Sequence, residues 1–312
     1  MIIVTGGLGF IGSSIANKLR ELNDEEILIV DDFKKGKKFL NLNFYNNISF
    51  VDSNSFYDSY LKNINPKKIK AIFHQGACTN TTEWDGELIL RKNLNSSISV
   101  FNFAKKNNIR FIYASSASVY GTNNNFEEIK KNEKPINLYA LSKLIFDNYV
   151  RSNSNKKTRY VGLRYFNVYG PKEFHKDNMS SPILKFYQQY KKNKTINLFK
   201  GTNDIKNGEQ KRDFIYIKDV VDINLWFLNN SHQGIFNVGT GKASSFNDIA
   251  SCFMNSLPKC KKKYVKFPEV LIGSYQNYTC ANIRNLRNIG YKKKFIDLEK
   301  GILEYIKILK KS

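Results

Sequence analysis

The chain opens with a glycine-rich turn between an apolar segment and a helical one, in MIIVTGGLGFIGSSIANKLREL. In the series of Gly6, Gly9 and Gly12, the first glycine permits a tight turn, the second lets the backbone approach a pyrophosphate, and the third lets the helix pack close to the sheet. The helix N-terminus behind the turn offers free N–H groups to phosphates. Because the series follows a strand and precedes a helix, it predicts a dinucleotide site rather than an ordinary βα turn. We expect Phe10 and Ile11 to contact the cofactor with these glycines.

A second apolar segment, EEILIV, ends in Asp31 and Asp32, at the distance where an acidic residue usually binds the adenosine ribose hydroxyls. That pattern favours NAD. The run FKKGKK follows at once, and its cations could hold a 2′-phosphate or form an exposed turn: Lys34, Lys35, Lys37 and Lys38. These residues alone leave both cofactors open. We predict NADP, with NAD as the alternative, and include Lys38 among the residues that bind it.

Strands and helices continue to alternate along the first half. The segment KAIFHQGA is a buried strand that ends in small residues suited to a close approach of the cofactor, and a helical pattern covers residues 86–106. This alternation predicts an α/β fold with a Rossmann-like doubly wound parallel sheet. We assign residues 1–170 to the dinucleotide-binding domain. Residues 171–312 form a smaller C-terminal α/β substrate-binding domain, from which DFIYI and IFNVG return to or flank the main sheet. The predicted cofactor contacts of this part are Gln75, Gly76, Ala77, Cys78, Thr79 and Asn93.

The net charge of +23 could indicate a nucleic-acid-binding protein. The lysines are, however, spread along the chain among many asparagines, without the clustering and interleaved aromatic residues that single-stranded nucleic acid needs. We therefore expect no nucleic-acid partner and interpret the charge as a compositional bias. No apolar run reaches the ~18 residues of a membrane span. The four cysteines lack the spacing of a metal site, and no signal peptide is recognised at the N-terminus, so a cytoplasmic protein without a metal is expected.

The segment NLYALSK places Tyr139 and Lys143 four residues apart in a helical pattern, which puts both side chains on one face. An ammonium beside a phenol stabilises the phenolate, so we expect Lys143 to lower the pKa of Tyr139 and fit it for proton transfer with a sugar hydroxyl. Ser116 ends the preceding strand and could bind the substrate oxygen. Lys143 could also bind the nicotinamide ribose. A lone Tyr-x-x-x-Lys is mostly structural. Here it follows the glycine turn and SSASVYG, and this combination is specific for a catalytic pair.

Together GGLGFIG, YASSASVYG, YALSK and RYFNVYGP resemble the extended short-chain dehydrogenase/reductase enzymes. Less general segments, among them GACTNTTEWDG and RYFNVYGPKEFHK, resemble the ADP-glyceromanno-heptose 6-epimerases. The resemblance implies a bound nicotinamide cofactor, a Tyr–Lys catalytic pair and an ADP-heptose substrate. It also implies inversion at C6 through a transient ketone, for the inner core of lipopolysaccharide, and a homo-oligomer, in that family a pentamer.

Inversion at one carbon needs proton transfer in two orientations of the intermediate, which one fixed acid/base cannot serve well. The resemblance assigns the second acid/base to the lysine of the His-Lys motif, which is Lys176 here. The alternative for Lys176 is a solvated loop lysine, and we expect His175 to have only a packing role. Lys176 and Val168 are also expected to contact the cofactor.

The resemblance further implies a set of substrate contacts. Arg212 fits a diphosphate by bidentate, charge-assisted bonds, or else forms a surface ion pair with Asp213. The full set is Asn167, Asn178, Lys185, Phe199, Lys200, Gly201, Thr202, Arg212 and Tyr275.

Two other functions stay open. The chain could be another nucleotide-sugar enzyme of the superfamily, such as a 4-epimerase or a dehydratase, or a dinucleotide sensor without catalysis. The TTEWDG and His-Lys segments favour the heptose enzyme. A dehydratase would be expected to carry an Asp-Glu pair after the serine or threonine of the catalytic strand, and SSASVYG has none. A sensor usually loses the Tyr or the Lys, and both are present.

Overall fold

The computed structural model describes residues 1–22, 25–44, 46–202, 205–268 and 276–311. Its strands are β1 (Ile2–Thr5), β2 (Ile27–Asp31), β3 (Ile48–Asp52), β4 (Ala71–His74), β5 (Arg110–Ser116), β6 (Tyr160–Tyr165), β7 (Asn167–Tyr169), β8 (Thr195–Phe199), β9 (Lys211–Arg212), β10 (Phe214–Tyr216), β11 (Gly234–Val238), β12 (Ser244–Ser245) and β13 (Lys261–Val265).

The helices alternate with these strands through the first half and then alternate less regularly. They are α1 (Phe10–Leu22), α2 (Ser53–Ser55), α3 (Leu61–Asn63), α4 (Gly86–Ile89), α5 (Ser96–Lys106), α6 (Leu138–Asn153), α7 (Pro182–Asn193), α8 (Ile217–Leu228), α9 (Phe246–Ser256), α10 (Arg284–Asn288) and α11 (Leu298–Leu309). The 3₁₀ turns are η1 (Gly36–Asn41), η3 (Pro66–Lys68), η5 (Ala117–Tyr120), η6 (Lys130–Asn132) and η7 (Phe174–Met179), and the π-type segments are η2 (Phe56–Tyr60) and η4 (Leu90–Asn95). The predicted helical pattern over residues 86–106 is thus confirmed as α4, η4 and α5 in succession.

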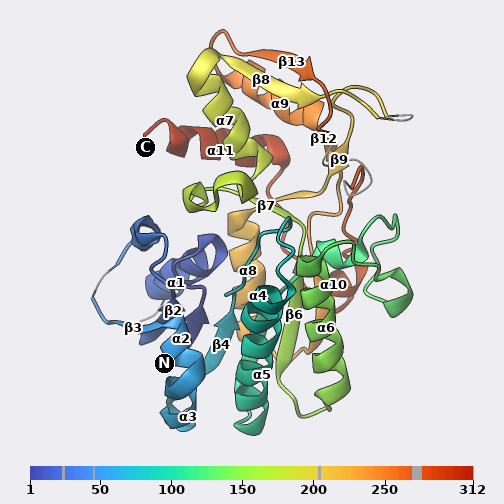
Figure 1. Cartoon of the computed structure of the whole chain (residues 1–312). Helices are drawn as coiled ribbons and strands as arrows, with labels where there is room; N and C mark the ends of the chain where they lie inside the picture. Colours follow the sequence, from blue (N-terminus) through green and yellow to red (C-terminus); the bar gives the residue numbers. More distant parts are fainter. Residues whose placement is uncertain (23–24, 45, 203–204, 269–275, 312) are drawn as a thin grey trace.

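A seven-stranded sheet forms the centre of the molecule, in the order β11-β6-β5-β4-β1-β2-β3, and every neighbouring pair is parallel (Figure 1). The order reverses between β1 and β4, because the chain first builds outward to β3 and then crosses back. Ligands of such sheets bind outside the carboxyl ends of the strands at this reversal. The predicted doubly wound Rossmann-like fold is confirmed.

Side chains of each strand alternate between two apolar layers, as the pleat of a strand dictates. On β1, Ile2 and Val4 join the layer under α1 and α8, whereas Ile3 joins the layer under α5 and α6. All three are fully buried. Because both faces are covered by helices, the strands are almost wholly apolar, which is the usual character of a parallel sheet.

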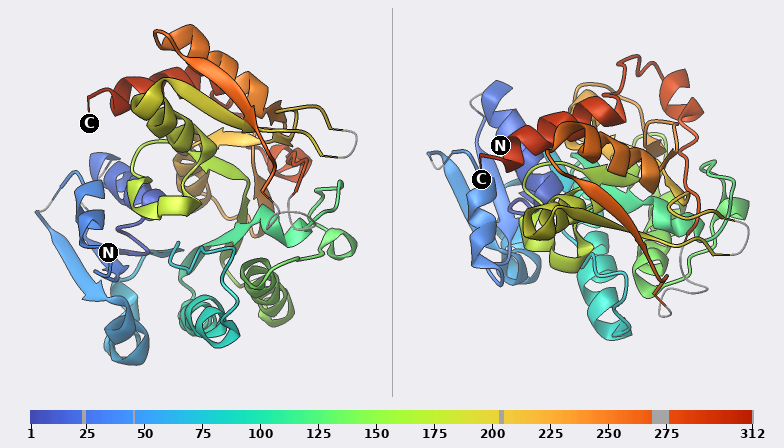
Figure 2. Two further views of the ribbon diagram at one scale, coloured as in Figure 1. Left: turned by 45° about the horizontal axis from the view of Figure 1, so that its top comes forward. Right: turned by 90° about the horizontal axis from the view of Figure 1, so that it is seen from above.

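A smaller lobe lies beyond one end of the sheet and contains β8, β13, α7, α9 and α11 (Figures 1 and 2). There β8 pairs in parallel with β13, and α7 and α9 pack on them. The buried residues of this lobe belong to the same apolar cluster as those under α1 and α8. The chain also returns to the central sheet at β11, as expected for IFNVG, while DFIYI supplies β10 beside β7. The division at residue 170 stays a prediction.

Asn167 and Val168, predicted to contact substrate and cofactor, lie just beyond the end of β6. They belong to β7, a separate short strand that pairs with β10 because the chain turns away from the sheet at Phe166. Among the described residues, no helix combines the length and the apolar character that crossing a membrane requires.

Candidate active site

The glycine turn lies between β1 and α1, at the carboxyl edge of the sheet. Gly6 has φ +63°, a conformation that residues with a side chain rarely adopt. A Cβ on Gly12 would lie 2.2 Å from the carbonyl oxygen of Gly6, so only glycine lets α1 start this close to the turn. Asp31 fixes the same turn from β2, because its Oδ2 accepts a hydrogen bond from Leu8 N at 2.8 Å. The cradle therefore fits a pyrophosphate.

The adenosine side of this cradle holds two carboxylates around one ammonium. Lys38 Nζ lies 2.5 Å from Asp31 Oδ1 and 2.9 Å from Asp32 Oδ1. Burial disfavours the charge of Lys38, yet its bonds to both carboxylates raise its pKa; burial also opposes ionisation of Asp32, whose pKa Lys38 lowers. Asp31 is buried and engaged with the glycine turn, so Asp32, the more exposed carboxylate, is the one open to a ribose.

The carboxyl end of β4 brings the predicted residues 75–79 opposite the glycine turn, where Gly76 packs against Gly6. Gln75 accepts a hydrogen bond from the Tyr165 hydroxyl at 3.1 Å. Its Nε2 is buried and, among the described residues, has no hydrogen-bond partner. An orphaned buried donor at the mouth of the cradle fits the binding of a polar cofactor.

Asn93, a predicted cofactor contact, bonds the turn that follows β4. Asn93 is buried, and its side-chain amide bonds the backbone N and O of Cys78 at 2.7 and 3.0 Å and the Ser142 hydroxyl at 3.1 Å. Because both ends of the amide are engaged, Asn93 braces the 77–79 turn, and its contact with the cofactor stays a prediction.

Tyr139 and Lys143 lie on one face of α6, which starts at an Asn137 cap that accepts from Ala140 N. The Tyr139 hydroxyl hydrogen-bonds Ser116 at the end of β5. The Lys143 ammonium lies 5.9 Å from the centre of the Tyr139 ring. The structure thus brings the three predicted catalytic residues together at the carboxyl edge of the sheet.

The expected pKa of Tyr139 is wrong in direction. Burial raises the pKa of its hydroxyl, although the hydrogen bond to Ser116 opposes the shift. The Lys143 ammonium donates to the Ala114 carbonyl at 2.8 Å. Burial also lowers the pKa of Lys143 to about 8, and Asp147 opposes that shift.

Asp147 belongs to a buried network that the sequence analysis missed. It is fully buried on α6, one turn after Lys143, and accepts hydrogen bonds from Tyr113 and Ser115 of β5, each at 2.9 Å. Arg164 of β6 donates to it from two nitrogens, at 2.8 and 3.0 Å. The only sequence signal for Asp147 was its spacing of four residues from Lys143, which places both side chains on one face of the helix. The network therefore fixes α6, and with it the catalytic pair, against the sheet.

Lys176 lies on η7, in the turn that joins β7 to α7. Its ammonium is 5.3 Å from the centre of the Phe10 ring, so this turn lies over the start of α1 and the glycine cradle. Burial lowers the pKa of Lys176; Glu173 opposes this shift and Lys185 adds to it. Lys176 is thus no freely solvated loop lysine. Met179 of the same turn contacts Thr81 of the TTEWDG segment, with 3.7 Å between Sδ and Oγ1.

The predicted substrate contacts fall into separate groups. Asn178 and Lys185 are exposed and joined by a 2.7 Å bond from Lys185 Nζ to Asn178 O, beside a hollow of about 430 Å³. Phe199 ends β8 in the smaller lobe, and residues 200–202 follow it. Arg212 is buried on β9. Tyr275 lies outside the described residues.

The alternative for Arg212, a surface ion pair with Asp213, is wrong because Asp213 is not on the surface. Asp213 is fully buried and accepts hydrogen bonds from the backbone N–H groups of Thr240, Gly241 and Ala281, at 2.8 to 3.0 Å. This carboxylate holds together the segments that follow β11 and precede α10.

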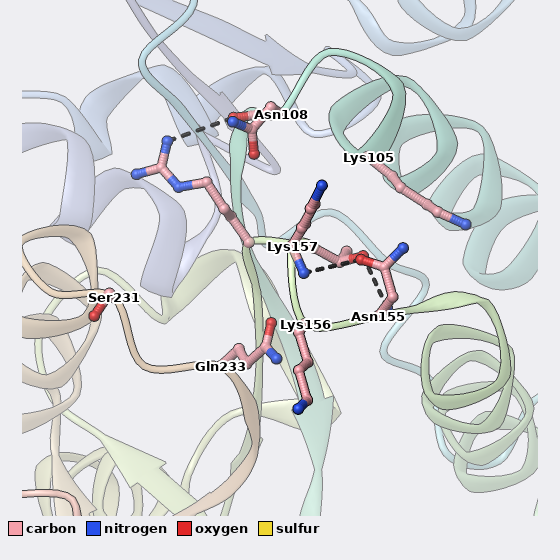
Figure 3. Close-up of a pocket in the computed structure, with 9 residues that line it drawn as sticks. Lys105, Asn108, Asn155, Lys156, Lys157, Ser231 and Gln233 are labelled. Carbon is pink, nitrogen blue, oxygen red and sulfur yellow. Dashed lines mark hydrogen bonds between the residues drawn. The ribbon is translucent and has the colours of Figure 1, made fainter.

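A larger hollow of about 670 Å³ lies at the opposite, amino-terminal edge of the sheet, before β5, β6 and β11. Figure 3 shows that Lys156 and Lys157 extend in opposite directions there, while Lys105 points away. These cations do not converge on one point, and none of the predicted site residues lies there. The candidate active site is therefore the carboxyl edge.

Residues 2–239 match the model of the NAD dependent epimerase/dehydratase family. The chain belongs to this family. It is an enzyme with a nicotinamide cofactor, and the epimerases of the family are isomerases. The structure resembles the ADP-L-glycero-D-manno-heptose-6-epimerase of Helicobacter pylori, with 33% identity, a TM-score of 0.87, and coverage of 99% of this chain and 96% of that one.

Two 4-epimerases are also similar in structure. The UDP-N-acetylglucosamine 4-epimerase of Methanobrevibacter ruminantium shares 28% identity, with a TM-score of 0.85 over 100% of this chain and 98% of that one. The UDP-glucose 4-epimerase of Thermotoga maritima shares 25% identity, with a TM-score of 0.82 over 99% and 98%. The family and a nucleotide-sugar type of enzyme follow, but not the sugar.

Proposed function

We propose that this enzyme converts ADP-D-glycero-β-D-manno-heptose to ADP-L-glycero-β-D-manno-heptose by transient oxidation at C6. The observation that carries the proposal is the position of Lys176 over the glycine cradle, which provides a second acid/base besides Tyr139. The similarity to the Helicobacter pylori heptose epimerase and the TTEWDG and His-Lys segments support the same sugar.

Tyr139 and Lys176 come from different parts of the fold, α6 and η7, and so can reach a substrate from different directions. When bound, the nicotinamide accepts the C6 hydride and returns it. Tyr139 would take the hydroxyl proton of one epimer, with Ser116 orienting the oxygen, and Lys176 would serve the other epimer after the ketone turns over. The lowered pKa of Lys176 suits this task, because it makes the neutral amine more accessible near neutral pH.

The remaining predicted residues would hold the two ends of the ligands. Arg212 is proposed to bind the diphosphate of the substrate, with Asn178 and Lys185 near the sugar. Asp32 and Lys38 are proposed to bind the adenosine ribose of the cofactor, and Lys38 would support the 2′-phosphate of NADP, with NAD as the alternative. Heating the protein to release its bound cofactor, followed by chromatography of the released nucleotide, decides between NADP and NAD.

The functional test is incubation of the purified protein with ADP-D-glycero-β-D-manno-heptose, and in parallel with UDP-glucose and UDP-N-acetylglucosamine, followed by ¹H NMR. We expect the L-glycero epimer without net oxidised product. Conversion of only the UDP-sugars would instead support the alternative, a 4-epimerase, to which the chain is nearly as similar.

Tyr139→Phe should slow turnover about 10²- to 10⁴-fold, the range for loss of a general acid/base. Tyr149→Phe is the matched control, since Tyr149 lies on the same helix and its hydroxyl bonds only Asn102 among the described residues. Equal rates in both variants would contradict the assigned role.

The remaining proposals are a cytoplasmic location, a place in the synthesis of the lipopolysaccharide inner core, and a homo-oligomer, whose size light scattering would measure.

A further inference from the structure

The turn that carries Lys176 is fastened at its base by one buried carboxylate. Glu173 is fully buried, and its oxygens accept hydrogen bonds from Ser181 N and Ser181 Oγ, each at 2.6 Å. Gly170 N lies 3.5 Å from the same carboxylate. The two ends of the turn are therefore held together, while the tip that carries Lys176 projects toward another part of the chain.

The tip is held by the segment on the adenosine side of the cofactor cradle, about 140 residues earlier in the chain. Lys35 Nζ donates to the His175 carbonyl at 2.8 Å and pairs with Asp177 Oδ2 at 2.5 Å. His175 Nδ1 lies 3.3 Å from Asn41 Nδ2, and the same amide nitrogen donates to the Leu8 carbonyl of the glycine turn at 2.9 Å. The contacts flank Lys176 on both sides.

The backbone at the tip adopts a strained conformation. Asp177 has φ 45° and ψ −121°, in a region that residues with a side chain rarely occupy. Such a conformation persists where surrounding contacts over-determine it. Within the turn, Ser180 N and Ser180 Oγ bond the Asp177 carbonyl, and outside it the contact is Lys35. Lys35 therefore bears directly on the conformation next to Lys176.

We propose that Lys35 is a positioning residue for Lys176, tying the catalytic turn to the adenosine side of the cofactor site through His175 and Asp177. This inference rests on the proposed function for the role of Lys176, but the physical link does not. Lys35 belongs to the lysine run that follows Asp32, so the link joins the adenosine side of the cofactor site to the turn that carries Lys176.

Hydrogen exchange of the protein with its bound cofactor tests the link without any substrate. In Lys35→Met, the amides of residues 174–179 should exchange about two- to fivefold faster, the range that one exposed ion pair can hold back. Lys35→Arg keeps the positive charge, so these amides should exchange as slowly as in the unchanged protein. The matched control is Lys218→Met, because Lys218 forms a similarly exposed pair with Glu304 at 2.6 Å far from this turn.

A second variant breaks the same contact from the other partner, so the test survives a folding failure of the first. Asp177→Asn should speed exchange of the same amides, and the double variant should be no faster than Lys35→Met alone. Additive effects, or unchanged exchange in Lys35→Met, would overturn the proposal.

Activity gives an independent readout. If the heptose assay succeeds, Lys35→Met should lower kcat while KM for the sugar changes little, and Lys35→Arg should recover the rate. A change in KM alone would contradict a positioning role. If the assay fails but the exchange result holds, the link stands and only the proposed substrate falls.

Discussion

Replacement of Asp147 by Asn should destabilise the protein and shift the titration of Lys143. Asp147 is fully buried and receives two hydrogen bonds from the Arg164 guanidinium and one each from Tyr113 and Ser115. Asparagine keeps the shape of the side chain but removes its charge. Arg164, which is fully buried, would then face an amide where it had a carboxylate.

Removal of one partner from a buried ion pair costs about 3–5 kcal/mol. The lower end applies here, because Glu133 Oε1 still pairs with Arg164 at 2.5 Å. With an unfolding entropy of about 2.1 cal/mol/K per residue, a loss of about 3 kcal/mol lowers the Tm of a chain of this length by roughly 5 °C. The Asp147 carboxylate also opposes the lowering of the Lys143 pKa, so its loss should move that pKa below about 8.

Calorimetry and the pH profile of turnover measure the two effects. Asp297→Asn is the matched control, because the Asp297 side chain is 82% exposed and forms only a long ion pair with Lys242, at 3.8 Å. It should change the stability by no more than about 0.5 kcal/mol. A loss in Asp147→Asn as small as in the control would refute the view that this network holds α6. If the fall of turnover at alkaline pH did not move to lower pH in Asp147→Asn, the effect of Asp147 on the pKa of Lys143 would be refuted.

Three further predictions concern the cofactor cradle and the catalytic groups. Gly12→Ala should abolish cofactor binding, because its Cβ would lie 2.2 Å from the carbonyl at the first turn glycine, whereas Gly86→Ala, with open space around its Cβ, should bind normally; fluorescence of bound reduced cofactor reports both. Lys176→Met should slow epimerisation while cofactor stays bound, and Lys191→Met, at an exposed lysine of α7, should not. Equal turnover in the two variants would contradict the acid/base role of Lys176. Turnover should fall as the pH rises through about 8, where Lys143 loses its charge, and an alkaline limb that stays flat to pH 10 would contradict this assignment.

The fold and the cofactor cradle could be predicted from the sequence because their determinants are local. The glycine turn, the acidic end of β2 and the small residues after β4 each lie within a few residues of a strand end, and parallel strands bring such ends to one edge. Tyr139 and Lys143 were likewise fixed by helical spacing alone.

The remaining features depend on contacts between distant segments. No local pattern shows that Arg164 meets Asp147 or that Lys35 reaches His175 across about 140 residues. The pKa of Tyr139 was predicted in the wrong direction because spacing gives proximity to Lys143 but not burial, and burial is the larger effect here. Likewise, only the fold shows that the Asn93 amide is engaged by Cys78.

The measurement that tests the central claim most directly is the fate of a deuterium label at C6 of ADP-D-glycero-β-D-manno-heptose, incubated with the enzyme in ordinary water. Transient oxidation at C6, with the hydride returned to the same carbon, predicts an L-glycero product that keeps its deuterium at C6. Label lost to solvent, or inversion at another carbon with C6 untouched, would contradict the proposed reaction and the roles of Tyr139 and Lys176 in it.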